Sequence, residues 1–142
     1  MRLLRSTPSF RPLPYVMLGC DPELFLANAN GQIVGSERAI PSGGLDFKNV
    51  VQDGVQVELN PAPSQCRELL AANIKGSFMT LKRRLDELSL HGQTFTASFR
   101  SVVEVDATEL SALSPAASAL GCAPSFNAYT SSASIAVDGS TY

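Results

Sequence analysis

The sequence predicts an α+β fold in which a mostly antiparallel, curved sheet packs on one long helix. Short apolar runs of strand-like composition are joined by Asn30-Gly31 and Asp53-Gly54, dipeptides that are typical of two-residue hairpin turns. Residues 64–90 instead repeat apolar side chains at spacings of three and four, the period of an amphipathic helix. Residues 94–105 return to alternation, which predicts a further long strand.

Length and composition fit a single globular domain that binds neither nucleic acid nor a membrane. The chain has 142 residues, 44% of them hydrophobic, which is enough for one core. Its net charge is −2, and it has no basic run that would follow a phosphate backbone. The longest apolar stretches are too short to span a bilayer, so we expect a cytoplasmic protein. Three widely spaced cysteines without a Cys-x-x-Cys unit argue against a disulfide framework and structural zinc.

The beginning of the chain differs in composition from the rest. Residues 1–15 are rich in Pro, Ser and Arg and lack periodicity, which predicts an extended arm that is loosely ordered or lies along a partner. Residues 16–142 are expected to form the domain. Its first strand is predicted at Val16–Ala27, where Pro22 indicates an edge position or a bulge. The turn that follows should return Gln32–Val34 antiparallel to this strand.

Two of the predicted strands carry carboxylates. In the first, alternation puts Asp21 and Glu23 on the side opposite to Leu24 and Leu26. The second strand has one apolar face, made by Val55, Val57 and Leu59, and one polar face, made by Gln56, Glu58 and Asn60. If the two polar faces coincide, Glu23 and Glu58 converge on one surface. Two interpretations remain open: the acids lie on solvated strand faces, or they form an oxygen-rich site for Mg²⁺.

A long helix should follow, because Pro61 and Pro63 end the second strand and Ser64 is a suitable N-cap. It is expected to run to about Leu90. Its apolar stripe consists of Leu70, Ile74, Phe78, Leu81, Leu85 and Leu88. The exposed side should carry ion pairs of Lys82 with Asp86 and of Arg83 with Glu87. The stripe is expected to cover the apolar side of the sheet and to leave the other side free for chemistry.

The chain beyond the helix supplies one further candidate site residue. Thr94–Val105 is predicted as a single long strand with Arg100 on its polar face. Arg100 is either solvent-exposed or a cation that holds phosphate or a carboxylate substrate. Leu110–Leu120 is rich in Ala and Ser and predicts a short helix or a loop, and Ser134–Val137 is a possible last strand.

Three sequence blocks occur in order along the chain. They are Gly19-Cys20-Asp21-Pro22-Glu23, then Asp53-Gly54-Val55-Gln56-Val57-Glu58-Leu59-Asn60-Pro61, then Gly121-Cys122-Ala123-Pro124-Ser125-Phe126-Asn127-Ala128-Tyr129-Thr130. In this order, with the long helix between the second and third, they resemble the phage and bacterial amidoligases. These are carboxylate–amine ligases with a glutamine-synthetase-like fold. The resemblance covers nearly the whole chain from Val16 onward and corresponds to the N-terminal half of that family.

The resemblance implies a chemistry and a set of site residues. ATP would phosphorylate a small-molecule or peptide carboxylate, and an amine would attack the acyl phosphate to form an amide. Glu23 and Glu58 would hold Mg²⁺, with Asp21 as an auxiliary ligand. Arg100 and Asn127 would line the cleft and bind the nucleotide. No catalytic residue is assigned. A phage-encoded member would act in the host cytoplasm.

The resemblance also implies an alternative. Family members continue into a Gly-Gly-His-x-His motif, whereas the single histidine of this sequence, His91, lies at the predicted end of the helix. The chain is therefore either part of a ligase or a non-catalytic phage accessory protein of virion assembly that uses the same sheet for docking. A half-domain with open sheet edges should form an oligomer or bind an assembly partner.

Overall fold

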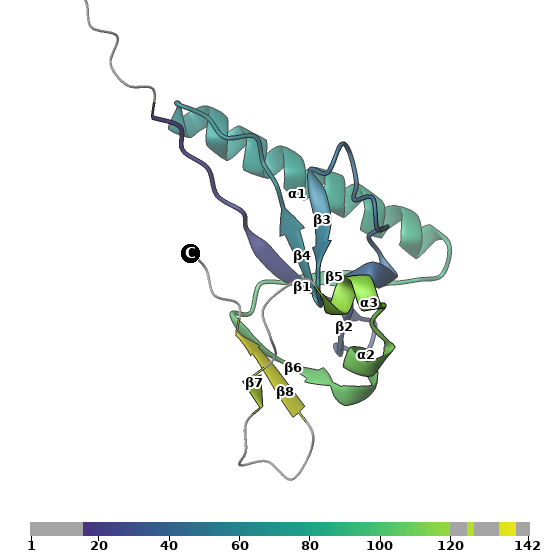
Figure 1. Ribbon diagram of the computed structural model, residues 1–142. Coiled ribbons are helices and arrows are strands. Elements are labelled where there is room, and N and C mark those ends of the chain that lie inside the picture. Colours follow the sequence, from purple (N-terminus) through teal and green to yellow (C-terminus); the bar gives the residue numbers. More distant parts are fainter. Residues whose placement is uncertain (1–15, 120–124, 127–133, 139–142) are drawn as a thin grey trace, which may run out of the picture.

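The protein is a mixed α+β domain with an open sheet and one long helix (Figure 1). The computed structural model describes residues 16–119, 125–126 and 134–138. The strands are β1 Glu23–Asn28, β2 Ile33–Val34, β3 Val50–Asp53, β4 Gln56–Leu59, β5 Phe95–Ser98, β6 Val102–Asp106, β7 Ser125–Phe126 and β8 Ser134–Asp138. The helices are the 3₁₀ turn η1 Ser36–Arg38 and the α-helices α1 Arg67–Leu90, α2 Ala107–Ala112 and α3 Pro115–Ser118.

β1 is the strand around which the sheet is organised. The described strands form one eight-stranded sheet in the order β3-β4-β1-β2-β6-β8-β7, and β5 pairs with β1 in addition. The predominance of antiparallel pairing is confirmed, since only β2 and β6 pair in parallel among the described strands. Both predicted hairpins are present, and Gly31 and Gly54 adopt the positive φ angles of 79° and 61° that their turns require. The turn at Asn30-Gly31 is longer than the two residues predicted, because the Asn28 N–H donates to the Gln32 carbonyl oxygen at 2.9 Å and residues 29–31 lie between them.

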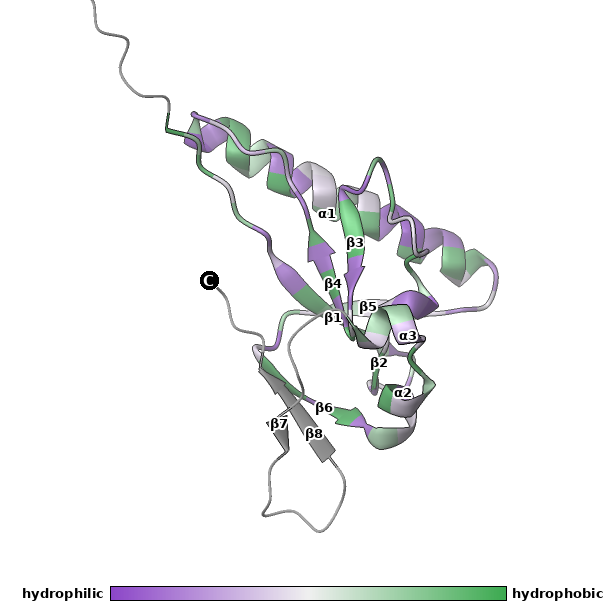
Figure 2. Ribbon diagram, in the orientation of Figure 1, coloured by the Kyte–Doolittle hydropathy of each residue, from purple (hydrophilic) through white to green (hydrophobic). Residues whose placement is uncertain are grey.

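α1 covers one face of the sheet, as its apolar stripe predicts. Alternate residues of β1 and β4, among them Leu24, Leu26 and Val57, pack with Leu81 and Leu85 of the helix in one buried cluster. Figure 2 shows hydrophobic and hydrophilic residues alternating along α1, as expected for a helix that buries one side. Only the second half of the stripe is fully buried, because Leu70 and Ile74 lie at an open end of the interface.

The opposite face is not left free as a whole, which corrects the prediction. Phe25, Ala27, Ile33, Val55, Val103 and Val105 form a second buried cluster, with Leu110 and Leu113 packed against it. Val55 belongs to this cluster because it lies in the turn after Gly54, so it does not continue the alternation of β4. The end of this face where β1 begins and β4 ends holds an open cavity.

Two predicted boundaries and one predicted ion pair are wrong. The first strand begins at Glu23, and before it the chain makes only an isolated bridge between Leu18 and Ser64. The N-cap of α1 is Cys66 and not Ser64, whose hydroxyl accepts a hydrogen bond from the Cys66 N–H at 3.1 Å. On the exposed side, Lys82 pairs with Asp86 at 2.6 Å as predicted, whereas Glu87 is 3.8 Å from Arg84 and not paired with Arg83.

The predicted long strand Thr94–Val105 is two strands with different partners. β5 runs antiparallel to β1, whereas β6 pairs in parallel with β2. The chain therefore leaves β1 before it reaches β2, and residues 99–101 make this connection. For Leu110–Leu120 a short helix or a loop was predicted, and the structure has helix there, in the end of α2 and in α3. The possible last strand, Ser134–Val137, lies within β8. No helix in the described part of the chain is long and apolar enough to cross a membrane.

Candidate functional site

Glu23 and Glu58 lie directly opposite each other on neighbouring strands. They are register partners in the antiparallel pair of β1 and β4. The N–H of Leu59 donates to the carbonyl oxygen of Pro22 at 2.9 Å, which makes Glu23 and Glu58 a non-hydrogen-bonded pair. In such pairs the Cα atoms are only about 4.5 Å apart and both side chains leave the same face. The expected convergence of the two acids on one surface is confirmed.

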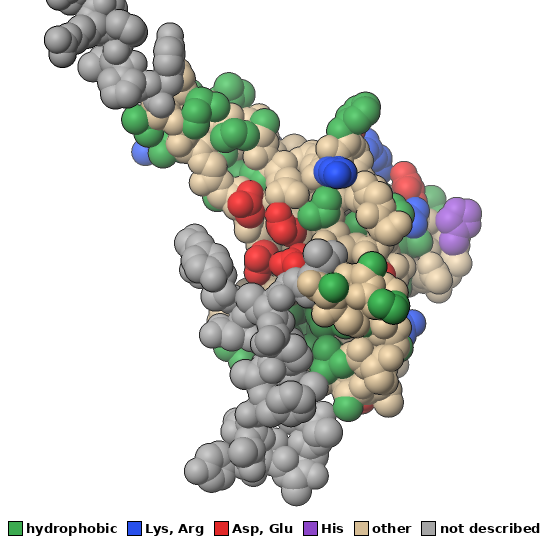
Figure 3. Space-filling model, viewed as in Figure 1, with side chains coloured by type: hydrophobic (Ala, Val, Ile, Leu, Met, Phe, Trp, Pro, Cys, Tyr) green, Lys and Arg blue, Asp and Glu red, His purple; other side chains and the backbone are tan. Residues whose placement is uncertain are grey.

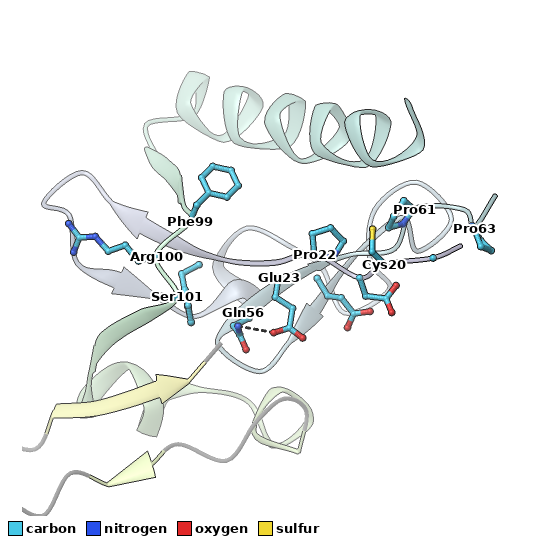
Figure 4. Close-up of a pocket in the computed structure, with 13 residues that line it drawn as sticks. Cys20, Pro22, Glu23, Gln56, Pro61, Pro63, Phe99, Arg100 and Ser101 are labelled. Atoms are coloured by element: carbon cyan, nitrogen blue, oxygen red, sulfur yellow. Dashed lines mark hydrogen bonds between the residues drawn. The ribbon is translucent and has the colours of Figure 1, made fainter. Parts of the chain in front are cut away.

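The two glutamates line a cavity of about 830 Å³ at the open end of the sheet. Asp21, Gln56, Arg100 and Ser101 also contribute to its wall. Figure 3 shows acidic side chains gathered over β1 and β4, and Figure 4 shows the lining residues at close range. The cavity lies on the face that α1 does not cover, so the apolar side of this helix packs behind the strands while their acids face the open side.

Both glutamates are less acidic than ordinary carboxylic acids. Burial raises the pKa of Glu23, and the charges of Asp53 and Asp21 add to this effect. Burial likewise raises the pKa of Glu58, with further contributions from Asp53, Asp21 and Glu23. After burial, the cause that both pKa shifts share is repulsion among the carboxylates of Asp21, Glu23, Asp53 and Glu58. A bound cation would reduce this repulsion.

Two residues of this site were not assigned a role from the sequence. Gln56 is only 2% exposed, and its Nε2 donates to Glu23 Oε2 at 3.0 Å, which orients that carboxylate. Asp53 is the register partner of Gln56 on β3, so it lies on the same face. The sequence feature that could have identified both residues is the Asp53-Gly54 turn, because a tight hairpin places the residues on either side of the turn opposite each other.

Arg100 lines the cavity without facing the acids. Figure 4 shows its guanidinium extending away from the Glu23 carboxylate. Among the described residues Arg100 takes part in no hydrogen bond or ion pair, and its side chain is exposed. β5 ends at Ser98, so Arg100 lies outside the strand. The alternation that placed Arg100 on a polar strand face therefore does not apply to it. Asn127 lies outside the described residues.

The site offers a pair of carboxylates and not a closed metal cage. In the residues that the structure describes, no group of three His, Cys, Asp or Glu side chains is arranged to hold a metal ion. Mg²⁺ rarely needs such a group, since it usually keeps several waters and is bound by one or two carboxylates together with substrate phosphates. A paired Glu23 and Glu58 in an open cavity fits that mode of binding.

In comparisons with known proteins, no protein-family model, no curated protein and no solved structure matches this chain.

Proposed function

We propose that this chain supplies the metal and nucleotide side of a carboxylate–amine ligase, as the front part of a glutamine-synthetase-like domain. The observation that carries the proposal is the cross-strand pair of Glu23 and Glu58 in a cavity of about 830 Å³. The three sequence blocks that resemble the amidoligases contain both glutamates and Asp21. Together they favour a divalent cation with a phosphate-bearing ligand over a simple solvated strand face.

Mg²⁺ and ATP, when bound, would supply the phosphoryl group that activates a substrate carboxylate for attack by an amine. The chain's own residues would bind and orient. Glu23 and Glu58 would hold the cation, and exposed Asp21 at the rim would act as an auxiliary ligand. Gln56 would keep one oxygen of Glu23 occupied, so that the other oxygen points in a defined direction.

The sequence also predicts that Arg100 and Asn127 bind the nucleotide. Arg100 lines the cavity on a segment between two strands, and rotation of its long side chain would bring the guanidinium toward a bound phosphate. Asn127 remains a prediction from the resemblance. The substrates would be a small-molecule or peptide carboxylate and an amine.

The proposal is tested by nucleotide binding to the full chain, with and without Mg²⁺. A fluorescent ATP analogue should bind more tightly in the presence of Mg²⁺. Glu23→Gln and Glu58→Gln should each weaken the Mg²⁺-dependent binding by at least about tenfold, since each removes a charged ligand. Glu104→Gln is the matched control, because Glu104 is exposed on β6 and does not line the cavity. Unchanged affinity in both cavity variants would end the proposal.

A non-catalytic assembly role is the second candidate. Val16, Met17 and Leu18 form an exposed apolar run, separated from β1 by residues 19–22. Such a run is typical of a surface that binds another protein or a second copy of the chain. We therefore expect association that weakens in the variant Val16→Ser/Met17→Ser when measured by sedimentation velocity. A monomer at all concentrations, with intact Mg²⁺-dependent nucleotide binding, would rule this candidate out.

A further inference from the structure

A second hollow adjoins the acidic cavity on the helix side of the sheet. It is an apolar groove of about 380 Å³ between α1 and the sheet, with Ala71, Ile74 and Phe78 on the helix side and Leu59 on the sheet side. Pro22, Glu23 and Phe99 line both the groove and the cavity. The two hollows therefore share part of their walls at one edge of β1.

The end of β5 opens this edge. β5 ends at Ser98, opposite Phe25, so no strand pairs with β1 beside Glu23 on that edge. The crossing segment after β5 places Phe99 next to the gap. Figure 4 shows its ring on the helix side of the sheet, with the Glu23 carboxylate on the other side.

Phe99 exposes an aromatic surface to the groove. Its side chain is 70% exposed, although its ring centroid is only 5.6 Å from that of Phe78 at a tilt of 35°. One aromatic ring of a ligand would extend this contact and cover apolar surface that is now in water. The groove thus has the shape and chemistry for an apolar side chain of moderate size.

Groups of opposite charge line the groove. Glu23 belongs to the wall that the groove shares with the cavity, and Lys75 of α1 also lines the groove. In the described part of the chain Lys75 forms no ion pair. An ammonium group toward Glu23 and a carboxylate toward Lys75 would each meet a complementary charge.

We propose that the groove binds the apolar side chain of the amine substrate, which is a primary amine that carries an aromatic or branched aliphatic group. This inference rests on the proposed ligase function, since it assigns the amine side of that reaction. The apolar group packs against the exposed ring of Phe99, beside Phe78, and the amine extends around the edge of β1 toward Glu23. Lys75 favours a free amino acid over an amine without a carboxylate.

The ligand test uses isothermal titration of the full chain without ATP or Mg²⁺. The probes are L-phenylalanine, phenethylamine, methylamine and 3-phenylpropionate. Phenethylamine should bind at least about tenfold more tightly than methylamine, because only phenethylamine buries a ring. It should also bind more tightly than 3-phenylpropionate, which lacks the amine. L-Phenylalanine should bind more tightly than phenethylamine, because only L-phenylalanine carries a carboxylate for Lys75, and equal affinity would overturn the role given to Lys75.

A pair of variants on α1 tests the location. Ala71→Phe places a ring in the groove and should weaken phenethylamine binding at least about tenfold. Ala72→Phe makes the same change at the next, exposed position, which does not line the groove, and should leave binding unchanged. Thermal unfolding of both variants checks that the fold is intact. Equal affinity of the two variants, or equal binding of phenethylamine and 3-phenylpropionate, would overturn the inference.

The two proposals fail separately in these measurements. A chain that binds phenethylamine but shows no Mg²⁺-dependent nucleotide binding would keep the groove and lose the ligase function. A chain that binds the nucleotide but none of the amines would lose only the groove.

Discussion

Neutralising one of the opposed glutamates should stabilise the metal-free protein at neutral pH. Glu23 and Glu58 are cross-strand partners, whose Cβ atoms lie about 4.5–5.5 Å apart in such pairs. Two unit charges about 5 Å apart repel by about 0.8 kcal/mol in water and by about 3 kcal/mol at an effective dielectric constant of about 20. Because both side chains are only half-buried, screening by solvent favours the lower figure. Glu23→Gln or Glu58→Gln should therefore raise the free energy of unfolding by about 0.5–1 kcal/mol.

A double-mutant cycle separates this pair from its surroundings. The variant Glu23→Gln/Glu58→Gln should gain less than the sum of the single gains, because either single substitution already removes the repulsion between the two glutamates and leaves only that by Asp53 and Asp21 for the second to relieve. Glutamine at position 23 keeps an oxygen that accepts the hydrogen bond from Gln56, so the packing is conserved. The control Glu104→Gln should change the free energy of unfolding by less than about 0.5 kcal/mol.

The pH dependence of stability has a defined sign. Burial, followed by the neighbouring carboxylates, raises the pKa of both glutamates above the ordinary value of 4.5. The folded protein therefore binds more protons than the unfolded chain between the ordinary and the raised pKa values, so stability is lost as the pH rises through this window. The single variants should show a smaller loss, and their advantage at pH 7 should disappear below pH 4.5.

Urea unfolding followed by far-ultraviolet circular dichroism, in the presence of EDTA, measures all of these quantities. Variants that are less stable than the wild type at pH 7, or an advantage that persists unchanged at acid pH, would refute the reasoning about the acidic cavity. Strictly additive single gains would show that the two glutamates do not repel each other.

Two further predictions concern the scaffold. Leu26→Ala should lower the free energy of unfolding by about 2–5 kcal/mol, because this side chain is 0% exposed between β1 and α1, whereas Leu90→Ala at an 86% exposed position should have little effect in the same urea experiment. Gly44→Ala should destabilise the protein by more than about 1 kcal/mol, because its φ is 72° and a Cβ there would lie 2.9 Å from the first carbonyl oxygen of β3. Gly43→Ala, where a Cβ would meet nothing within 4 Å, is its control, and equal melting temperatures for the two variants would contradict the strain argument.

The features that could be predicted from sequence are those with local causes. Hairpin turns need glycine at a position of positive φ, and Gly31 and Gly54 supply it. The helix follows from a repeated spacing, and the shared face of Glu23 and Glu58 follows from alternation once two strands pair.

The features that could not be predicted depend on distant partners. Alternation continues through Phe99–Ser101, yet β5 and β6 separate there because one pairs with β1 and the other with β2. The same applies to the candidate site. Gln56 reaches Glu23 only because β4 pairs with β1, and the direction of Arg100 depends on where β5 ends.

The break between β5 and β6 also explains why the acidic cavity and the apolar groove meet. Had β5 continued, a paired strand would have closed the edge of β1 beside Glu23 and separated the two faces of the sheet. Because the chain crosses at Phe99 instead, one edge gives access to carboxylates on one side and to an aromatic groove on the other. A ligand that needs both surfaces can reach them only at this point, so substitutions at Phe99 should affect amine binding more than nucleotide binding.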